Sequence, residues 1–308
     1  MNFCDYWSNH RIEDDWLFKT LGRHYEMEIS ERPDFLFCSV FGNRHFRHRD
    51  CVKIFWTGEN TTPNFNFYDY ALGFDYIEFE DRYMRLPLYA LACNMEPRIL
   101  KQFSEGKSRE EMLGRKFCNF VYSNRRAKAR TDFFEKLSRY KRVDSGGRFM
   151  NNVGGPCADK CEFQSKYKFS IAFENSESNG YTTEKIIDAF KAGTIPIYWG
   201  NPRVSEEINP GSFINYYDYG SLDKLMERVV EVDQNEELYM AMLHASPFAS
   251  GRFARGLSQE RLDEFLINIV ENGTRRSIKR KTLWRNEKPD MIREYMSQLC
   301  SRLGMNRR

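Results

Sequence analysis

The chain has 308 residues, of which 41% are apolar and 30% are charged. This composition is typical of a globular protein with a substantial buried core, and it excludes a largely disordered chain. The net charge is +3, but residues 274–308 hold eleven Lys or Arg against three Asp or Glu, a net +8 that leaves −5 on the remainder. A basic tail on a mildly acidic body, without a nucleic-acid-binding motif, argues against nucleic acid as a partner.

The eight cysteines are too few and too scattered for a disulfide scaffold, which favours reduced thiols and a cytoplasmic location. Cys157 and Cys161 have a spacing that metal sites use, but no second pair lies nearby. The first fifteen residues are too polar for a signal peptide, and no run of eighteen apolar residues occurs. We therefore expect a cytoplasmic protein without a membrane span and without a structural metal.

The first half of the chain mixes apolar, strand-like runs with helical segments. Apolar runs without strict alternation suit strands that are covered on both faces, as in a parallel sheet. Strands are predicted at 34–41, 51–56 and 70–75, and helices at 14–24, 86–94 and 98–113.

A second series of strands and helices begins after residues 113–115. Strands are predicted at 117–122, 167–173 and 194–199, and helices at 126–140, 183–192, 221–232 and 259–270. Alternating strands and helices indicate right-handed crossover units. The chain thus predicts an α/β fold of two Rossmann-like, doubly wound domains that face each other across a cleft. The expected domains are 1–114 and 115–273, followed by a tail at 274–308.

In such sheets ligands bind outside the carboxyl ends of the strands. One strand end leads through YTTEK into a helix, which Thr182 or Thr183 is expected to cap. Lys185 then lies in the first turn, where the helix dipole disfavours a cation, so an anion such as a diphosphate is expected there. Glu184 is placed to accept from ribose hydroxyls. The alternative is an ordinary capped surface helix with an adjacent charge pair.

Two other strand ends also carry charged residues. Arg126, Lys128 and Arg130 crowd the first turns of the helix that follows strand 117–122, where any one of them can clamp a phosphate or form a solvated basic face. Glu59 directly follows strand 51–56 and is a candidate general base. The alternative is that Glu59 only caps a turn.

Several familiar motifs are missing. The sequence has no two aspartates separated by one residue, no GxGxxG, no Walker phosphate loop and no HExxH. A nucleotide site held by Arg, Lys and backbone dipoles, with no metal, is the simplest interpretation.

At this point a family resemblance becomes clear. The stretch FENSESNGYTTEKIIDAFKAGTIPIYWGNP resembles the signature of the α-1,3/4-fucosyltransferases that use GDP-fucose. WTGENTTPNFNFYDYALGFDYIEFEDRYMRLPLY resembles the acceptor-side segment of the bacterial members, and KFCNFVYSN with ARTDFFEKL resembles their donor-side strand and helix. The resemblance covers roughly residues 2–251.

The resemblance implies a GT-B fold with the acceptor domain first and the donor domain second. It implies an inverting transfer of L-fucose from GDP-β-L-fucose to a hydroxyl of N-acetylglucosamine in a Lewis-type acceptor, with the linkage open between α-1,3 and α-1,4. No cofactor is expected to be required, and a divalent metal is expected to be at most stimulatory. The implied roles are a general base at Glu59, diphosphate contacts at Arg130 and Lys185, a ribose contact at Glu184, donor-pocket contacts at Asn175 and Tyr181, and an acceptor contact at Trp56.

Some features depart from the family pattern. Thr182 stands where a β-branched apolar residue is usual, and neither the seven-residue repeats of bacterial relatives nor the membrane anchor of animal relatives is found. A soluble form of bacterial type is therefore expected. Two other functions stay open: an inverting GT-B transferase for another nucleotide sugar, and a non-catalytic glycan-binding protein on the same fold.

The basic tail has an amphipathic pattern. Residues 286–303 place Met, Ile, Tyr and Leu on one helical face, and RRSIKRK precedes them. The tail is expected either to pack on the first domain or to bind the inner membrane surface peripherally through anionic lipids.

Overall fold

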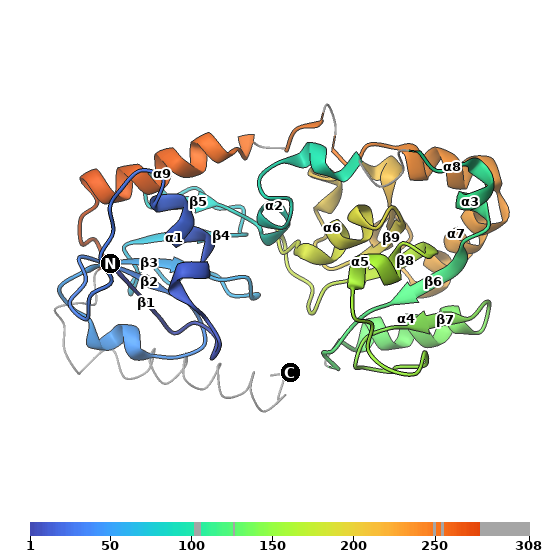
Figure 1. The fold of residues 1–308 in the computed structure, drawn as a ribbon, viewed down its shortest axis with the longest axis horizontal. Coiled ribbons are helices and arrows are strands. Elements are labelled where there is room, and N and C mark those ends of the chain that lie inside the picture. The colour runs from blue at the N-terminus through green and yellow to red at the C-terminus, as the bar shows by residue number, and fades with distance from the viewer. Residues whose placement is uncertain (102–105, 126, 249–250, 254–255, 278–308) are drawn as a thin grey trace. The chain divides into compact units, whose positions relative to one another are not determined.

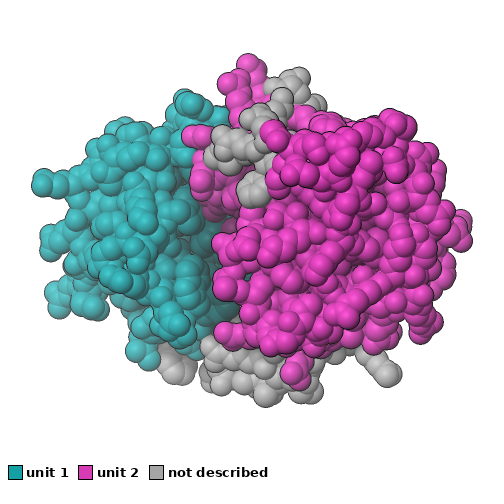
Figure 2. Space-filling model, turned by 45° about the vertical axis from the view of Figure 1, so that its right-hand side comes forward, with its two compact units in different colours: residues 1–86, 258–308 teal, residues 87–257 magenta. Residues whose placement is uncertain are grey.

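A computed structural model describes residues 1–101, 106–125, 127–248, 251–253 and 256–277 (Figure 1). The chain forms two compact units: unit 1 contains residues 1–86 and the chain from Ser258 onward, and unit 2 contains residues 87–257 (Figure 2). These units do not coincide with the expected boundaries at 114/115 and 273/274. The reason is packing, because residues 87–113 pack within unit 2 and the helix at 259–272 packs within unit 1.

Unit 1 is built on a five-stranded parallel sheet. Its strands lie in chain order, β1-β2-β3-β4-β5. The strands are β1 (Asn2–Cys4), β2 (Phe35–Cys38), β3 (Val52–Trp56), β4 (Tyr70–Gly73) and β5 (Tyr83–Arg85); the helices are η1 (Ile12–Asp14), α1 (Trp16–Leu21), η2 (Arg44–Arg47) and α9 (Gln259–Asn272).

The two faces of this sheet are covered differently. Side chains alternate along a strand, so neighbours on β2 belong to opposite faces. Phe35 and Phe37 lie on the side of α1 and α9, with Leu266 of α9. Leu36 belongs to a core on the other face, which segments around η2 and residues 65–68 cover. The sheet is therefore buried on both sides, as its unbroken apolar strands require.

The chain beyond α9 is fixed to the sheet by Asp69, whose side chain is buried. One carboxylate oxygen accepts from the backbone N–H of Lys53 at 2.7 Å, and the other accepts from the N–H groups of Arg276 and Ser277, both at 2.7 Å. Residues separated by more than 200 positions thus share one carboxylate, which explains why the chain after Ser258 belongs to unit 1.

Unit 2 is built on a second five-stranded parallel sheet, with the order β10-β9-β8-β6-β7. Its strands are β6 (Lys116–Phe120), β7 (Val143–Ser145), β8 (Tyr167–Phe173), β9 (Ile195–Trp199) and β10 (Ile214–Asn215). Its helices are α2 (Leu88–Ala92), η3 (Pro97–Lys101), α3 (Arg109–Leu113), α4 (Lys128–Ser138), α5 (Lys160–Gln164), α6 (Glu184–Lys191), η4 (Val204–Glu206), η5 (Pro210–Ser212), η6 (Tyr216–Asp218), α7 (Leu222–Gln234) and α8 (Glu236–His244).

Helices cover both faces of this sheet. The core on one face joins Phe169 and Ile171 of β8 with Phe133 of α4 and Val229 of α7. On the other face α6 packs against β8, β9 and α2. The chain starts at β6, moves outward to β7, and then returns past β6 to β8, β9 and β10. The direction of strand order therefore reverses between β6 and β8.

Most predicted elements are confirmed within a few residues. Strand 167–173 is found at the same bounds, and helix 259–270 is found as α9. The single helix predicted at 98–113 is wrong, because η3 ends at Lys101 and α3 starts only at Arg109. Ser108 and Glu111 form a capping box that starts α3 afresh. The strands β5, β7 and β10 and the helices α5 and α8 were not predicted.

Other expectations concern cysteines, membrane spans and the tail. The seven cysteines of the described residues are free. No helix among those residues is both long and apolar enough to cross a membrane. The amphipathic segment predicted at 286–303 lies outside the described residues, as does Arg126.

Candidate active site

The reversal of strand order in unit 2 marks where a ligand site is expected. In open α/β sheets ligands bind outside the carboxyl ends of the two strands at which the order reverses. Here those strands are β6, which leads to Tyr122 and Asn124, and β8, which leads to Glu174 and Asn175. The predicted donor residues therefore come from the loops at this point and from the helices that follow, α4 and α6.

Arg130 of α4 joins the two strand ends. Its guanidinium is fully buried (0% exposed) and lies 3.8 Å from the centre of the Tyr122 ring. It donates hydrogen bonds to the carbonyl oxygens of Phe173, Glu174 and Asn124 and to Oδ1 of Asn175, at 2.8–3.3 Å. Neutral oxygens are thus its partners, and it forms no ion pair with any residue in the described part of the chain. A buried cation without a carboxylate produces a positive potential that favours an anion nearby.

Lys185 of α6 lies in a second, linked cluster. Its ammonium is 3.1 Å from Oε2 of Glu174 and 3.2 Å from Oε1 of Glu184, and it donates to Oγ1 of Thr183 at 2.9 Å. Glu174 is fully buried and accepts from both the N–H and the hydroxyl of Thr183 at 2.7 Å. A buried carboxylate therefore holds the ammonium at the start of the helix.

The pKa shifts in this cluster follow from burial and from the paired charges. Burial alone would lower the pKa of Lys185, but the carboxylates of Glu174 and Glu184 outweigh it and raise that pKa, so the ammonium stays charged. Burial raises the pKa of Glu174 in spite of Lys185. Burial acts in the same direction on Glu184, but Lys185 outweighs it and the pKa of Glu184 is lowered. The cluster thus combines a cation with one carboxyl group whose pKa is raised and one whose pKa is lowered.

The expected helix cap takes another form. Thr183 is the N-cap residue of α6, but its side chain does not cap the helix, because the hydroxyl is bonded to Glu174. Thr182 is buried and its hydroxyl accepts from Asn201 instead. The capping prediction is therefore wrong for the side chains of both residues. The first N–H groups of α6 depend on partners other than a threonine hydroxyl.

Gly200 is a close neighbour of Glu174. Its φ is +149°, and a Cβ atom at this position would lie 2.4 Å from Cγ of Glu174. The site therefore requires glycine here, both for the backbone angle and for the space that Glu174 occupies.

The structure brings Arg130, Asn175, Glu184 and Lys185 into one region of unit 2, with the buried residue Tyr181 on the loop before α6. Sequence analysis missed Glu174, which stands immediately after β8. An acidic residue directly after a buried strand, beside the predicted Asn175, was the available signal. No sequence pattern indicates the two hydrogen bonds that Glu174 accepts from Thr183.

Glu59 and Trp56 belong to unit 1, at the carboxyl end of β3. Glu59 is exposed; its N–H donates to Oγ1 of Thr57 at 3.1 Å, and its carboxylate has no partner among the described residues. Trp56 is only 5% exposed, and its ring packs against those of Tyr6 and Trp16. Glu59 is thus free to meet a substrate, whereas Trp56 forms part of the layer behind it.

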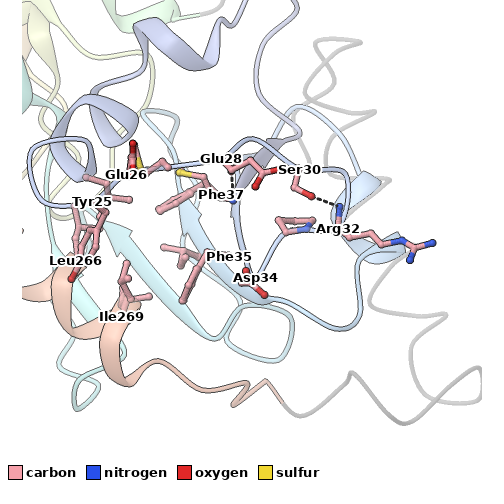
Figure 3. A pocket seen from close by; sticks show the side chains of 16 residues that line it. Tyr25, Glu26, Glu28, Ser30, Arg32, Asp34, Phe35, Phe37, Leu266 and Ile269 are labelled. Carbon is pink, nitrogen blue, oxygen red and sulfur yellow. Dashed lines mark hydrogen bonds between the residues drawn. The ribbon is translucent and has the colours of Figure 1, made fainter.

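A cavity of about 310 Å³ lies at the other, amino-terminal edge of the unit 1 sheet. Phe35 and Phe37 of the sheet face Leu266 and Ile269 of α9 across it, and Arg32 extends away from it (Figure 3). None of the predicted site residues lines this cavity. It is therefore separate from the site that the sequence predicted.

The described residues contain no group of three or more His, Cys, Asp or Glu side chains that could hold a metal ion.

A parallel α/β unit with cations at the reversal of strand order has the features of a nucleotide-binding unit. Residues 1–92 match the family described as "Alpha-(1,3)-fucosyltransferase FucT N-terminal domain", and residues 112–245 match "Glycosyltransferase family 10 (fucosyltransferase) C-term". Two solved structures are similar to this chain, both with a TM-score of 0.77 and covering 89% of this chain and 90% of theirs. They are an α1,3-fucosyltransferase with GDP, at 31% identity, and one with GDP-fucose, at 30% identity.

The chain belongs to the glycosyltransferase family 10 fucosyltransferases, and its two parallel α/β units are those of the GT-B fold class. It is 32% identical to the α-(1,3)-fucosyltransferase FucT of Helicobacter pylori over 88% of this chain and 66% of that protein. It is 33% identical to the human 4-galactosyl-N-acetylglucosaminide 3-alpha-L-fucosyltransferase 9 over 37% of this chain and 32% of that protein. The chain thus spans less than two thirds of the length of these curated relatives.

Proposed function

We propose that this protein transfers L-fucose from GDP-β-L-fucose to a hydroxyl of N-acetylglucosamine with inversion at the fucose carbon. The observation that carries the proposal is the pair of cations at the strand reversal of unit 2, the buried Arg130 and the largely buried Lys185. Family membership supports the same donor, since structures of relatives contain GDP and GDP-fucose.

In the proposed reaction the bond between the fucose C1 and the diphosphate oxygen breaks as the acceptor oxygen bonds to C1. Negative charge builds up on the departing GDP, and the positive potential of Arg130 and Lys185 stabilises it. Glu184 is proposed to contact the ribose, and Asn175 and Tyr181 to line the donor pocket.

Glu59 is proposed as the general base that takes the proton of the acceptor hydroxyl. It is exposed, it directly follows a buried strand, and its carboxylate has no partner among the described residues. No cofactor is proposed to be required, because fixed cations already serve the diphosphate. Product formation should therefore continue when EDTA is added.

The acceptor is proposed to be an N-acetyllactosamine-type glycan, which would give a Lewis-type product of the kind found in protein or lipid glycosylation. Support comes from the name of the human relative, which specifies transfer to a galactosyl-N-acetylglucosaminide. Type 1 and type 2 disaccharides, offered in parallel, would distinguish the α-1,4 from the α-1,3 product.

The test is turnover of GDP-fucose with N-acetyllactosamine, followed by mass spectrometry and NMR of the product. An α-fucoside is the expected result, with inhibition by GDP and not by UDP. Inhibition by UDP instead would favour a transferase for another nucleotide sugar. Glycan binding without any turnover would favour a non-catalytic glycan-binding protein.

A further inference from the structure

The carboxyl edge of the unit 1 sheet carries a continuous group of aromatic side chains. It is formed by residues that follow β1 and β2, that end β3, and that begin α1. We call it the aromatic platform; its members are Tyr6, Trp7, His10, Trp16, Phe41 and Trp56.

The platform has a buried lower layer. Tyr6 lies nearly parallel to Trp56, with ring centres 6.3 Å apart and an angle of 27° between the planes. Trp16 meets Trp56 edge to face at 5.3 Å. Trp56 stands three residues before Glu59 on the same strand end, so the layer continues directly into the segment that holds the proposed base.

The upper layer is open. Trp7 is 46% exposed, more than any other large apolar residue among those described. Its ring contacts with His10, Phe41 and Tyr6 are inclined at 82°, 89° and 48°, so none of these three rings stacks parallel on its face. A flat ring that is half exposed and not covered by a parallel neighbour can receive another flat, partly apolar ring.

The platform is held in place by hydrogen bonds of Asp15. His10 Nε2 is 2.7 Å from Oδ2 of Asp15, and the other oxygen of Asp15 accepts from the N–H of Leu17 at the start of α1. His10 also packs 4.2 Å from the ring centre of Tyr6. The exposed Trp7 is thus supported by residues whose positions the fold fixes, which is what a preorganised binding surface requires.

Oη of Tyr6 and Nε1 of Trp16 are buried and lack a hydrogen-bond partner among the described residues, so they lie beneath the surface that a ligand would contact. A ligand whose ring has an apolar face and hydroxyl groups at its edge would suit the exposed aromatic surface above them.

We propose that the aromatic platform binds a pyranose ring of the acceptor glycan, with Trp7 as the residue on which its apolar face stacks. This inference rests on the proposed function, since Glu59 lies on the same edge of the same sheet. Trp56, which we expected to contact the acceptor, is buried and packs against Tyr6, so its proposed role is to support the platform. Trp7 is therefore a specificity-determining residue that leaves donor binding untouched.

The experiment compares Trp7→Ala, Trp7→Phe and the control Ile29→Ala. Ile29 is similarly exposed (42%), but lies on the segment bonded to Met1 at the opposite edge of the sheet. We expect Trp7→Ala to raise the KM for N-acetyllactosamine about tenfold or more. The kcat, the rate of GDP-fucose hydrolysis without acceptor and the Kd for GDP should stay unchanged. Trp7→Phe should recover part of the loss, and Ile29→Ala should match the wild type.

A second measurement separates this inference from the proposed function. Saturation-transfer NMR reports glycan binding without turnover. Binding that Trp7→Ala abolishes supports the platform even if no fucose is transferred. An unchanged acceptor KM in Trp7→Ala, alongside normal product formation, overturns the platform and leaves the proposed function intact. Light scattering that shows a wild-type dimer and a Trp7→Ala monomer would assign the surface to a second copy of the chain and likewise overturn it.

Discussion

Substitution of Lys185 is expected to have two effects, because its ammonium is proposed to bind a diphosphate and also pairs with the buried Glu174. Lys185→Met should weaken GDP binding about 10- to 100-fold, because a hydrogen bond to a charged group contributes about 1.5–3 kcal/mol. It should also destabilise the protein by about 3–5 kcal/mol, because Glu174 is left without its cation in a buried site. Calorimetry with GDP and urea unfolding measure the two effects separately.

A matched second substitution distinguishes binding from folding. Adding Glu174→Gln to Lys185→Met removes the unpaired charge while keeping an oxygen for the N–H of Thr183. Stability should then largely return, whereas GDP affinity should stay low. Recovery of GDP affinity in the double variant would mean that Lys185 acts only through the fold.

Glu59 provides a simpler case, since its carboxylate has no partner among the described residues. Glu59→Gln should lower kcat about 10²- to 10⁴-fold, the usual contribution of a general base. The Kd for GDP should not change, because the proposed diphosphate contacts belong to unit 2. The measurement is steady-state kinetics together with GDP calorimetry, and normal turnover in the variant would reject the assignment.

The loop between β2 and β3 is tied to the end of β1 through Asp5, which is buried and has a φ of +60°. Its carboxylate accepts from the N–H of Arg44 at 2.8 Å and from the N–H and Nδ1 of His45 at 3.0 and 2.6 Å. Burial alone would raise the pKa of Asp5, but these hydrogen bonds outweigh it, so the pKa is lowered from its ordinary value of 3.8.

A carboxyl group whose pKa is lower in the folded state stabilises the fold above its unfolded pKa. This contribution is lost as the pH falls through the lowered, folded value. Asp5→Asn should therefore cost about 1.5–3 kcal/mol at pH 7, and the difference from wild type should shrink only below about pH 4. Urea unfolding from pH 7 to pH 3 tests this, and a difference that does not depend on pH would contradict it.

Regular elements with strong local signals could be predicted from the sequence. Strand 167–173 is an unbroken apolar run, and α9 follows Ser258, whose side chain accepts from the N–H of Arg261. The membership of α9 in unit 1 could not be predicted, because it depends on packing against α1, more than 200 residues away. The break between η3 and α3 had a local signal in Ser108 and Glu111, but helical periodicity concealed it.

The charged residues of the candidate site could be predicted from the sequence, but their hydrogen-bond and ion-pair partners could not. Lys185 stood out because a cation in the first helical turn opposes the dipole. Arg130 was expected to reach a phosphate, yet its guanidinium is enclosed by the carbonyl oxygens of Phe173 and Glu174. Every residue type has the same backbone carbonyl group, so no sequence pattern indicates which carbonyl oxygens will accept from Arg130.

Unit 2 is one continuous stretch of chain, whereas unit 1 needs two. Residues 87–257 contain their own sheet, helices that cover both of its faces, and all the proposed diphosphate contacts. The isolated fragment 87–257 should therefore fold and bind GDP within about tenfold of the full chain, since no proposed GDP contact is removed. Circular dichroism and calorimetry measure this. A folded fragment that does not bind GDP would place part of the donor site in unit 1.

The opposite charges of tail and body suggest a second role for residues 278–308. Each Lys or Arg near an anionic membrane contributes about 1 kcal/mol, and salt screens the attraction. The full chain should therefore sediment with vesicles rich in phosphatidylserine or phosphatidylglycerol at low salt, and be released at about 1 M NaCl, where the screening length falls to about 3 Å. A chain truncated after Ser277 keeps the hydrogen bonds from Arg276 and Ser277 to Asp69, so it should stay folded and bind GDP normally. It should no longer sediment with the vesicles. Equal sedimentation of both chains would show that the tail does not provide the contact, and loss of folding on truncation would favour a tail that packs on unit 1.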